Sequence, residues 1–283
     1  WNSRAARTVT DILSARSVDL VNLQYSPSMY SASFKYAWRA AARQFPLVTS
    51  FHTLWGGGSI NYLFALQLLS ASRAVLATNT EIVYLLEKYL PIFLKKTRRI
   101  PIGSNIRPSS KSQHNVEVEY RLREGAPLLS YFGMCYPGKG MKTLFEVARV
   151  LKERLDYQLL LIGGGMSDDE PYRRQAVAQV EEYGVEDNVL WTGRLASDDV
   201  STLLARSEAI LLPYETGVSD RRGSLMAALA HGRAIVTTAP RIEGFPFRQR
   251  ENMVWPERHG AEAFAELIVQ VLGDEQLRKR LEL

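Results

Sequence analysis

The sequence predicts an α/β protein made of two domains, each built around a doubly wound parallel sheet. Three observations support this fold class. Short, nearly continuous apolar runs recur along the chain, as expected of strands buried on both faces. Helical patterns separate most of these runs, and such alternation is typical of parallel sheets with right-handed crossovers. A length of 283 residues also suits two domains better than one.

Strands are expected wherever an apolar, β-branched run is short and bounded by turn residues. In the first half these runs cover residues 19–25, 46–52, 74–78 and 98–103. In the second half they cover residues 127–133, 157–164, 188–193, 209–214, 233–238 and 252–256. Helices are expected over residues 139–154, 170–183, 197–206 and 260–272, and a short alanine-rich helix is expected to follow residues 221–224.

The polar stretch from residue 105 to 126 interrupts this alternation. It contains Pro108 and a cluster of serines, which are typical of a linker or of an edge element. We therefore predict an N-terminal Rossmann-like domain over residues 1–107 and a C-terminal Rossmann-like domain over residues 108–283. The first domain opens on a helical pattern, whereas a doubly wound domain normally begins with a strand and a ligand-binding turn. We expect the N-terminal part of that domain to be missing from this chain.

Composition excludes some classes of protein. A net charge of +5 and a pI near 9.3 suit an anionic ligand or membrane surface, although many basic proteins have neither partner. The single Cys135 excludes an internal disulfide framework and fits a reducing compartment. No zinc-binding spacing is present, and no apolar run reaches the roughly 18 residues of a membrane span. We expect a cytoplasmic protein, soluble or peripheral to the inner face of the membrane, without a nucleic-acid partner.

The carboxyl ends of parallel strands are where ligands bind, and residues suited to an anion follow several of the predicted strands. Lys139 begins a helix after the strand 127–133, where it can reach a phosphate held by backbone N–H groups. A surface lysine on a first helical turn is the alternative. Gly163–Gly165 follow the next strand and permit close approach of a ligand, or else form a tight turn without one.

The stretch "SDRRGSLMAALAHG" (219–232) follows the strand 209–214. Arg221 and Arg222 can neutralise a diphosphate at the start of the helix, Gly223 permits close approach and Ser224 can cap the helix. The alternative is a packed helix with two solvated arginines.

Two histidines lie at element ends. His52 ends the strand 46–52 and precedes glycines, so it can bond a phosphate or hydroxyl, or be a buried structural residue. For His231, at a helix C-terminus, a structural role with the helix dipole is expected. Asn79 sits at the start of a predicted helix, where capping of that helix explains it as well as a functional role does.

Taken in this order, the motifs resemble those of GT-B glycosyltransferases, specifically the retaining group 1, or family 4, enzymes. The resemblance covers residues 19–280 and is most specific between residues 127 and 260. The matching pieces are "SFHT" (50–53), "FGMCYPGKGMKTLFEVARVL" (132–151), "LLIGGG" (160–165), "NVLWTGRLASDDVSTLLARSEAILLPY" (188–214) and "GSLMAALAHGRAIVTT" (223–238).

The resemblance implies a hexosyltransferase that moves a sugar from a nucleotide-diphospho-sugar to a carbohydrate or lipid-linked acceptor. The resemblance also implies that the transfer retains the anomeric configuration and that the enzyme needs neither a metal nor a cofactor. By this resemblance Lys139 contacts the donor diphosphate, and His52 faces the donor sugar. The backbone of Gly223, Ser224 and Leu225 holds the distal phosphate, and the nucleoside side is formed by Gly163, Gly164, Gly165, Gly193 and Arg194.

Two departures from the family pattern bear on activity. Relatives typically carry two glutamates in a Glu-x7-Glu pattern, whereas here the second position is Ala227 and the first falls on Asp220 or Ser219. We take Asp220, with His52 and Lys139, as the candidate catalytic residues.

The second departure concerns positive charge. An arginine often follows the glycine equivalent to Gly133, and here that residue is Met134. We hypothesise that Arg221 or Arg222 supplies the lost charge from another loop.

Other interpretations stay open. The lost glutamate and Met134 favour a non-catalytic nucleotide-sugar-binding or scaffold relative. A nucleotide-sugar epimerase of the GT-B fold would need more acid–base residues than are visible. The segments 33–45 and 88–99 interleave basic and aromatic residues, which suits peripheral contact with an anionic membrane, although ordinary amphipathic structure explains them as well.

Overall fold

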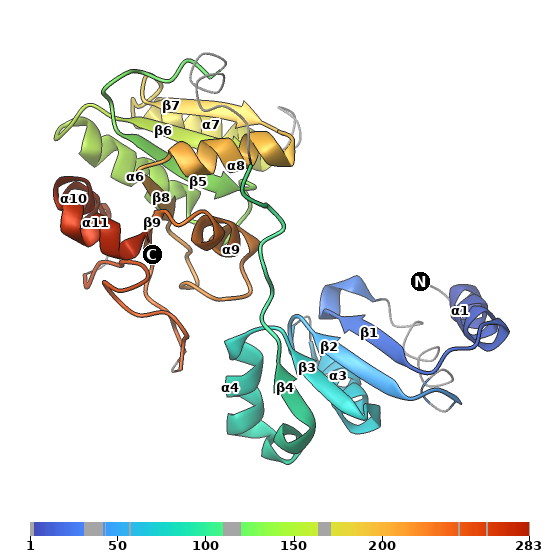
Figure 1. Cartoon of the computed structure of the whole chain (residues 1–283). Helices are drawn as coiled ribbons and strands as arrows, with labels where there is room; N and C mark the ends of the chain where they lie inside the picture. Colours follow the sequence, from blue (N-terminus) through green and yellow to red (C-terminus); the bar gives the residue numbers. More distant parts are fainter. Residues whose placement is uncertain are drawn as a thin grey trace. The chain divides into compact units, whose positions relative to one another are not determined.

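The computed structural model describes residues 3–30, 42, 44–56, 58–109, 120–163, 171–242, 244–258 and 260–282. The chain divides into two compact units, Trp1–Ile102 and Gly103–Leu283. Each unit is a parallel sheet with helices packed against it (Figure 1). The boundary that we predicted at residue 107 lies within the second unit, which begins at Gly103.

Within its described residues, the first unit contains a parallel sheet in the order β1-β2-β3-β4. Helix α3 connects β2 to β3, and helix α4 connects β3 to β4. Each connection moves to the next strand in the same direction across the sheet, so right-handed crossovers place both helices on the same face. Tyr25, Phe51 and Phe64 meet there in edge-to-face contacts and form the centre of the core. The elements are α1 (Ser3–Ala15), β1 (Val21–Tyr25), η1 (Pro27–Met29), β2 (Leu47–Phe51), α3 (Ser59–Ala71), β3 (Ala74–Ala77), α4 (Thr80–Tyr89), η2 (Pro91–Lys96) and β4 (Thr97–Arg99).

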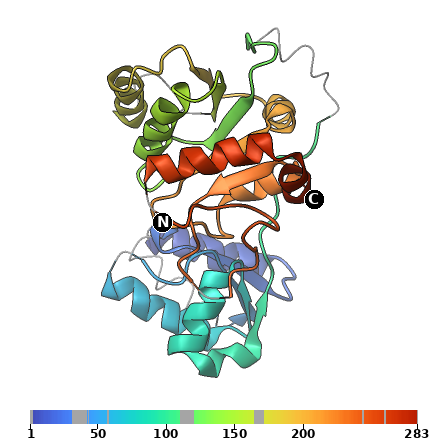
Figure 2. The same cartoon turned by 90° about the vertical axis from the view of Figure 1, so that its left-hand side faces the viewer.

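The second unit contains a parallel sheet in the order β7-β6-β5-β8-β9. Right-handed crossovers place α6 and α7 on one face and α8 and α9 on the other. Helix α10 packs against α6, β8 and β9 and lies across the sheet in Figure 2. The elements are β5 (Leu128–Gly133), α6 (Met141–Lys152), β6 (Gln158–Gly163), α7 (Pro171–Glu182), β7 (Val189–Gly193), α8 (Ser197–Arg206), β8 (Ala209–Leu212), α9 (Gly223–Ala230), β9 (Ala234–Thr237), α10 (Ala261–Gly273) and α11 (Glu275–Leu281).

The predicted strand over residues 252–256 is wrong. Val254 pairs with Val236 only as an isolated bridge. Both backbone groups of Val254 bond β9: its N–H donates to the Ile235 carbonyl and its carbonyl accepts from the Thr237 N–H, each at 2.9 Å. The next residue that would face β9 is Pro256, which has no N–H to donate, so the ladder does not continue. The other strands that we predicted all form, within a few residues of the expected bounds.

The two units share one capping device between a helix end and a neighbouring strand. In the first unit, the Ser72 hydroxyl lies 2.7 Å from the Thr49 hydroxyl of β2. In the second unit, the Ser207 hydroxyl lies 2.5 Å from the Ser130 hydroxyl of β5. Each capping serine also donates to the carbonyl four residues before it. Both buried pairs therefore fix where a helix ends against its sheet.

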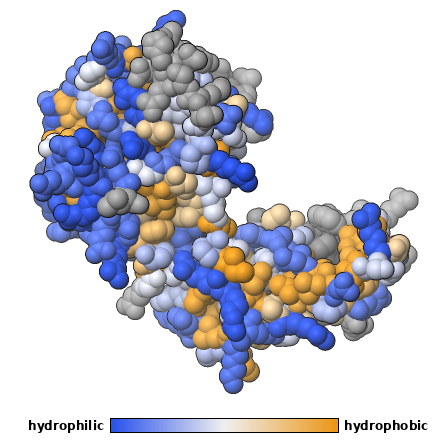
Figure 3. Space-filling view, in the orientation of Figure 1, coloured by the Kyte–Doolittle hydropathy of each residue, from blue (hydrophilic) through white to orange (hydrophobic). Residues whose placement is uncertain are grey.

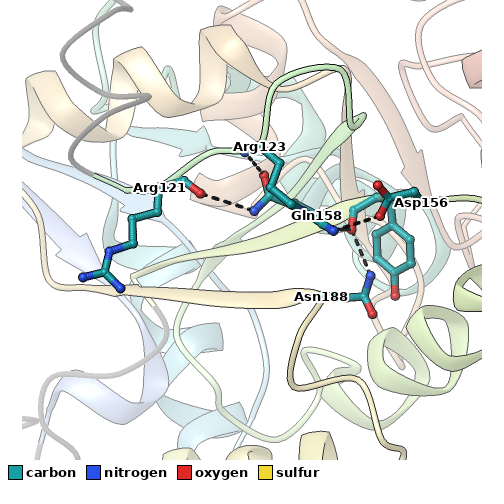
Figure 4. Close-up of polar contacts among 6 residues, drawn as sticks. Arg121, Arg123, Asp156, Gln158 and Asn188 are labelled. Atoms are coloured by element: carbon teal, nitrogen blue, oxygen red, sulfur yellow. Dashed lines mark hydrogen bonds and ion pairs between the residues drawn. The ribbon is translucent and has the colours of Figure 1, made fainter.

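A hydrogen-bond network fastens the segment before β5 to the amino ends of β6 and β7 (Figure 4). The backbone N–H of Arg123 donates to Oε1 of Gln158, and Gln158 is only 3% exposed. The Arg123 guanidinium donates to the Tyr157 carbonyl and pairs with Asp156 at 2.9 Å. Asn188 donates to the same carbonyl at 3.0 Å. This network lies at the amino edge of the sheet, opposite the edge where ligands bind.

Replacing Gln158 by methionine is expected to lower the free energy of unfolding of the second unit by about 1–3 kcal/mol, because the Arg123 N–H loses its acceptor. Methionine keeps the side chain's length, so no cavity forms. The matched control is Asp156→Ala, which removes an ion pair whose carboxylate is 73% exposed and costs at most about 1 kcal/mol. Denaturant unfolding measures both, and equal losses would contradict the assignment.

Candidate functional site

The strand order of the second unit locates its ligand-binding edge. Counted along the chain, the order β7-β6-β5-β8-β9 reverses direction between β5 and β8. In open parallel sheets, ligands bind outside the carboxyl ends of the strands at this reversal. The loops that leave β5 and β8 there carry the predicted residues Lys139, Asp220, Arg221 and Arg222.

These two loops touch. Gly140 has φ +76°, and a Cβ there would lie 1.7 Å from the Pro213 carbonyl oxygen. Glycine is therefore required both by the left-handed backbone and by the close approach. The Glu215 N–H also donates to the Gly138 carbonyl, at 3.4 Å. The loop after β5 and the loop after β8 are thus packed directly against each other.

Tyr214 lies between the predicted phosphate-binding residues and is fully buried. The Lys139 ammonium lies 5.6 Å from the centre of its ring, and the Arg222 guanidinium lies 4.7 Å from it. The Tyr214 hydroxyl is 2.7 Å from the hydroxyl of Ser224. We call Lys139, Tyr214, Arg222 and Ser224 the switch-point cluster.

The switch-point cluster concentrates positive charge. Burial lowers the pKa of Lys139, and the charge of Arg222 lowers it further. Among the residues that the structure describes, no carboxylate forms an ion pair with Lys139. Two cations at one partly buried position favour the binding of an anion, because an anion there relieves their repulsion.

Helix α9 adds backbone donors to this positive charge. Its N-cap residue is Arg222, and no side chain caps the helix. No heavy atom lies within 4 Å of the position that a Cβ on Gly223 would occupy, so a ligand can approach there. The prediction that Ser224 caps the helix is wrong, because Ser224 lies inside α9 and its hydroxyl bonds Tyr214. The Leu225 side chain is fully buried, which leaves only its backbone for a ligand.

The turn before α9 contains the remaining predicted residues of this loop. Asp220 is 2% exposed, and Arg221 is half-buried. The Arg222 guanidinium also donates to the hydroxyl of Thr216, at 2.9 Å. The Arg222 guanidinium is in contact with the ring of Tyr214.

The predicted nucleoside side lies at the ends of β6 and β7. The Gly163 N–H donates to the hydroxyl of Thr192 at 3.2 Å, and that hydroxyl donates to the Gly193 carbonyl at 3.0 Å. Thr192 therefore ties the two strand ends together. Arg194 is exposed in the loop that follows. Gly164 and Gly165 lie outside the described residues.

His52 belongs to the first unit, at the end of β2. It is half-buried, and its Nε2 lies 2.9 Å from Oε1 of Gln24, which fixes the imidazole. Asn79 donates to the His52 carbonyl and caps α4 by accepting from the Ile82 N–H. His231 follows α9, as expected from the sequence, with Nδ1 2.7 Å from the Ala227 carbonyl.

Sequence reasoning gave no role to Tyr214, Thr192 or Gln24. Tyr214 is the last residue of the predicted strand 209–214, at the strand end where ligand-binding residues gather. Its aromatic side chain, however, is equally typical of a core residue. Among the described residues, no group of three or more His, Cys, Asp or Glu side chains could hold a metal. No described helix is long and apolar enough to cross a bilayer.

Comparison with known proteins shows the family of the chain. Residues 113–282, more than half of the chain, match the family "Glycosyl transferases group 1". A curated relative is the GDP-mannose-dependent α-(1-6)-phosphatidylinositol monomannoside mannosyltransferase of Mycobacterium tuberculosis H37Rv. It is 28% identical over 111 residues, which are 39% of this chain and 27% of the relative's length. The match thus spans only about a quarter of that protein.

Solved structures show the same fold. Sucrose-phosphate synthase from Thermosynechococcus elongatus superposes with a TM-score of 0.76 at 19% identity, over 98% of this chain and 70% of that one. Anabaena HepE in complex with UDP and glucose superposes with a TM-score of 0.73 at 16% identity, over 98% and 74% of the two chains. The predicted pair of parallel-sheet α/β domains, as in GT-B glycosyltransferases, is confirmed. The chain belongs to the group 1 glycosyltransferase family.

Proposed function

We propose that this protein is a hexosyltransferase that moves a sugar from a nucleotide-diphospho-sugar to a carbohydrate or lipid-linked acceptor, with retention of configuration and without a metal. The observation that carries the proposal is the switch-point cluster, where Lys139 and Arg222 lie 5.6 Å and 4.7 Å from the centre of the Tyr214 ring, beside the uncapped start of α9. Breaking the sugar–phosphate bond leaves negative charge on the diphosphate, and oriented cations and N–H groups stabilise that charge. The resemblance of the motifs to retaining relatives supports retention.

In this proposal, Lys139, Arg222 and the first backbone N–H groups of α9 hold the diphosphate. Gly163–Gly165, Gly193 and Arg194 form the nucleoside side, and Asp220 and His52 act at the sugar. The relatives' names mention both GDP-mannose and UDP, so the base and the sugar stay open. A half-buried imidazole held by Gln24 is suited to bonding a sugar hydroxyl.

Calorimetric titration with UDP and GDP tests the site, and a donor-hydrolysis and transfer assay tests the reaction. We expect micromolar to millimolar binding of one of the two, as is usual for enzyme substrates, and transfer that persists in the presence of EDTA. NMR of the product's anomeric proton tests retention. Tight binding without hydrolysis or transfer would instead indicate the non-catalytic scaffold. Absence of binding to either nucleotide would overturn the proposal.

We also propose that the segment 88–99 contacts anionic membranes. Tyr89 and Ile92 are 53% and 78% exposed, and Lys88 and Lys95 are exposed beside them. Figure 3 shows apolar and hydrophilic surface interspersed over the first unit. Most of the segment 33–45 lies outside the described residues. Co-sedimentation with anionic but not with neutral liposomes is expected, and equal binding to both would contradict the proposal.

The charge-replacement hypothesis now favours Arg222 over Arg221, because Arg222 contacts Tyr214 beside Lys139. We expect Arg222→Ala to weaken binding of the preferred nucleoside diphosphate by about 10–100-fold, the effect of losing one hydrogen bond to a charged group. Arg221→Ala is the matched control and is expected to have a smaller effect. Unchanged affinity in both variants would show that neither arginine supplies the charge.

A further inference from the structure

The feature that organises the switch-point cluster is an aromatic residue without charge. Tyr214 contacts Lys139 and Arg222 through its ring and Ser224 through its hydroxyl. These three residues come from two separate loops and from helix α9. We assign Lys139 and Arg222 to the donor diphosphate, and Ser224 belongs to the first turn of α9, which is proposed to bind it.

We infer that Tyr214 is a positioning residue: its ring holds the Lys139 and Arg222 cations at the diphosphate position, and its hydroxyl fixes Ser224 in the first turn of α9. The inference rests on the proposed function, because it explains how that same site keeps its shape before a ligand arrives.

The two cations need such support. Lysine and arginine have long side chains that lose much rotamer freedom when they are ordered, and two neighbouring positive charges repel each other. An aromatic face attracts cations, more strongly when they are removed from water. Lys139 is half-buried, and its pKa is lowered by that burial, so the contact with Tyr214 is formed in partly desolvated surroundings.

Tyr214 is itself held rigidly. Its carbonyl accepts from the Thr238 hydroxyl at 2.8 Å and from the Gly217 N–H at 3.1 Å. The carbonyl of the preceding Pro213 is packed against Gly140. A ring fixed in this way can order two flexible side chains at little further entropic cost.

The hydroxyl of Tyr214 stays neutral, because burial raises its pKa to about 12. A neutral hydroxyl can either donate to Ser224 or accept from it. The bond joins the end of β8 to the first turn of α9, whose N–H groups are proposed to face the phosphate. Removing the hydroxyl therefore loosens the helix start, and removing the ring releases the cations.

Inorganic pyrophosphate is the probe for this inference, since it carries the diphosphate without a base or sugar. Calorimetry on the full chain, well below each variant's thermal midpoint, should show pyrophosphate binding to the wild-type protein. Tyr214→Leu is expected to weaken that binding by about 10–100-fold through the loss of two cation–π contacts. Tyr214→Phe keeps the ring and is expected to weaken binding only a few-fold. Tyr157→Phe, which alters another fully buried tyrosine bonded to the Ala148 carbonyl, should leave pyrophosphate affinity unchanged.

A double-mutant cycle distinguishes positioning from a merely structural role. If Tyr214 acts through Lys139, Tyr214→Leu should weaken pyrophosphate binding less in a Lys139→Ala background than in the wild type. Should Tyr214→Leu not fold, the same cycle with Tyr214→Phe and Ser224→Ala tests the hydroxyl. Independent effects in the cycle, or wild-type affinity in the Tyr214 variants, would overturn the inference alone. A wild-type chain that binds neither pyrophosphate nor a nucleoside diphosphate would overturn the proposed function, and the inference with it.

Discussion

Replacing Lys139 by alanine is expected to lower the turnover of sugar transfer by roughly 10²–10³-fold, the usual effect of removing one preorganised donor from a developing negative charge. Lys139 lies beside Arg222 over the Tyr214 ring, where the leaving diphosphate is proposed to sit. The matched control is Lys142→Ala. Lys142 is exposed on the first turn of α6 and forms an ion pair with Glu146, at 3.8 Å, so the Lys142→Ala variant should retain wild-type turnover.

The pH dependence of Lys139 gives this prediction a second measurement. Because burial and Arg222 lower the pKa of Lys139, its charge is lost at a lower pH than that of an ordinary lysine. Turnover and diphosphate affinity should therefore fall as the pH rises through that lowered pKa. Lys139→Arg keeps its charge to a higher pH and should move this alkaline decline upward. An unmoved decline, or full turnover in Lys139→Ala, would remove Lys139 from the proposed mechanism.

The second large effect is expected from Gly140→Ala, which should lower the free energy of unfolding of the second unit by about 2–5 kcal/mol. A left-handed backbone costs a non-glycine residue about 1–2 kcal/mol, and overlap with the Pro213 carbonyl adds roughly 1–3 kcal/mol. Diphosphate binding should also weaken, because moving Pro213 displaces Tyr214. Calorimetric or denaturant unfolding of the second unit measures the first effect.

Gly138→Ala is the matched control for this substitution. Gly138 has φ +82° in the same loop, but no heavy atom lies within 4 Å of its would-be Cβ. Gly138→Ala should therefore lower the free energy of unfolding by about 1–2 kcal/mol, which is the conformational cost alone. If Gly138→Ala and Gly140→Ala were equally destabilising, the close approach to Pro213 would contribute nothing.

The order of strands and helices could be predicted because parallel strands buried on both faces leave a plain signal of short apolar runs. The run 252–256 has the same apolar character but forms only a single bridge to β9, at Val254, because Pro256 cannot donate the next ladder bond. The proline can be read from the sequence, but only the fold shows that its backbone position faces β9.

The candidate site was predictable where its chemistry depends on local sequence. Lys139 and Arg222 carry charges at strand ends, and both positions can be read from the chain alone. Tyr214 could not be given a role in this way, because its importance comes from contacts with residues on two other segments. Ser224 was assigned to the wrong partner for the same reason, since capping is a local pattern and the bond to Tyr214 is not.

The contact between Gly140 and Pro213 also constrains how this protein can diversify. The loops after β5 and β8 are in close contact at these two residues, so neither loop can change its length independently of the other. Insertions in these loops should therefore be rare among homologous chains. At the end of β7 there is more room, because no described heavy atom lies within 4 Å of the position that a Cβ on Gly193 would occupy. If the proposed donor site is correct, a change of donor base is expected to arise from substitutions beside β7 rather than from changes in the two loops that meet at Gly140 and Pro213.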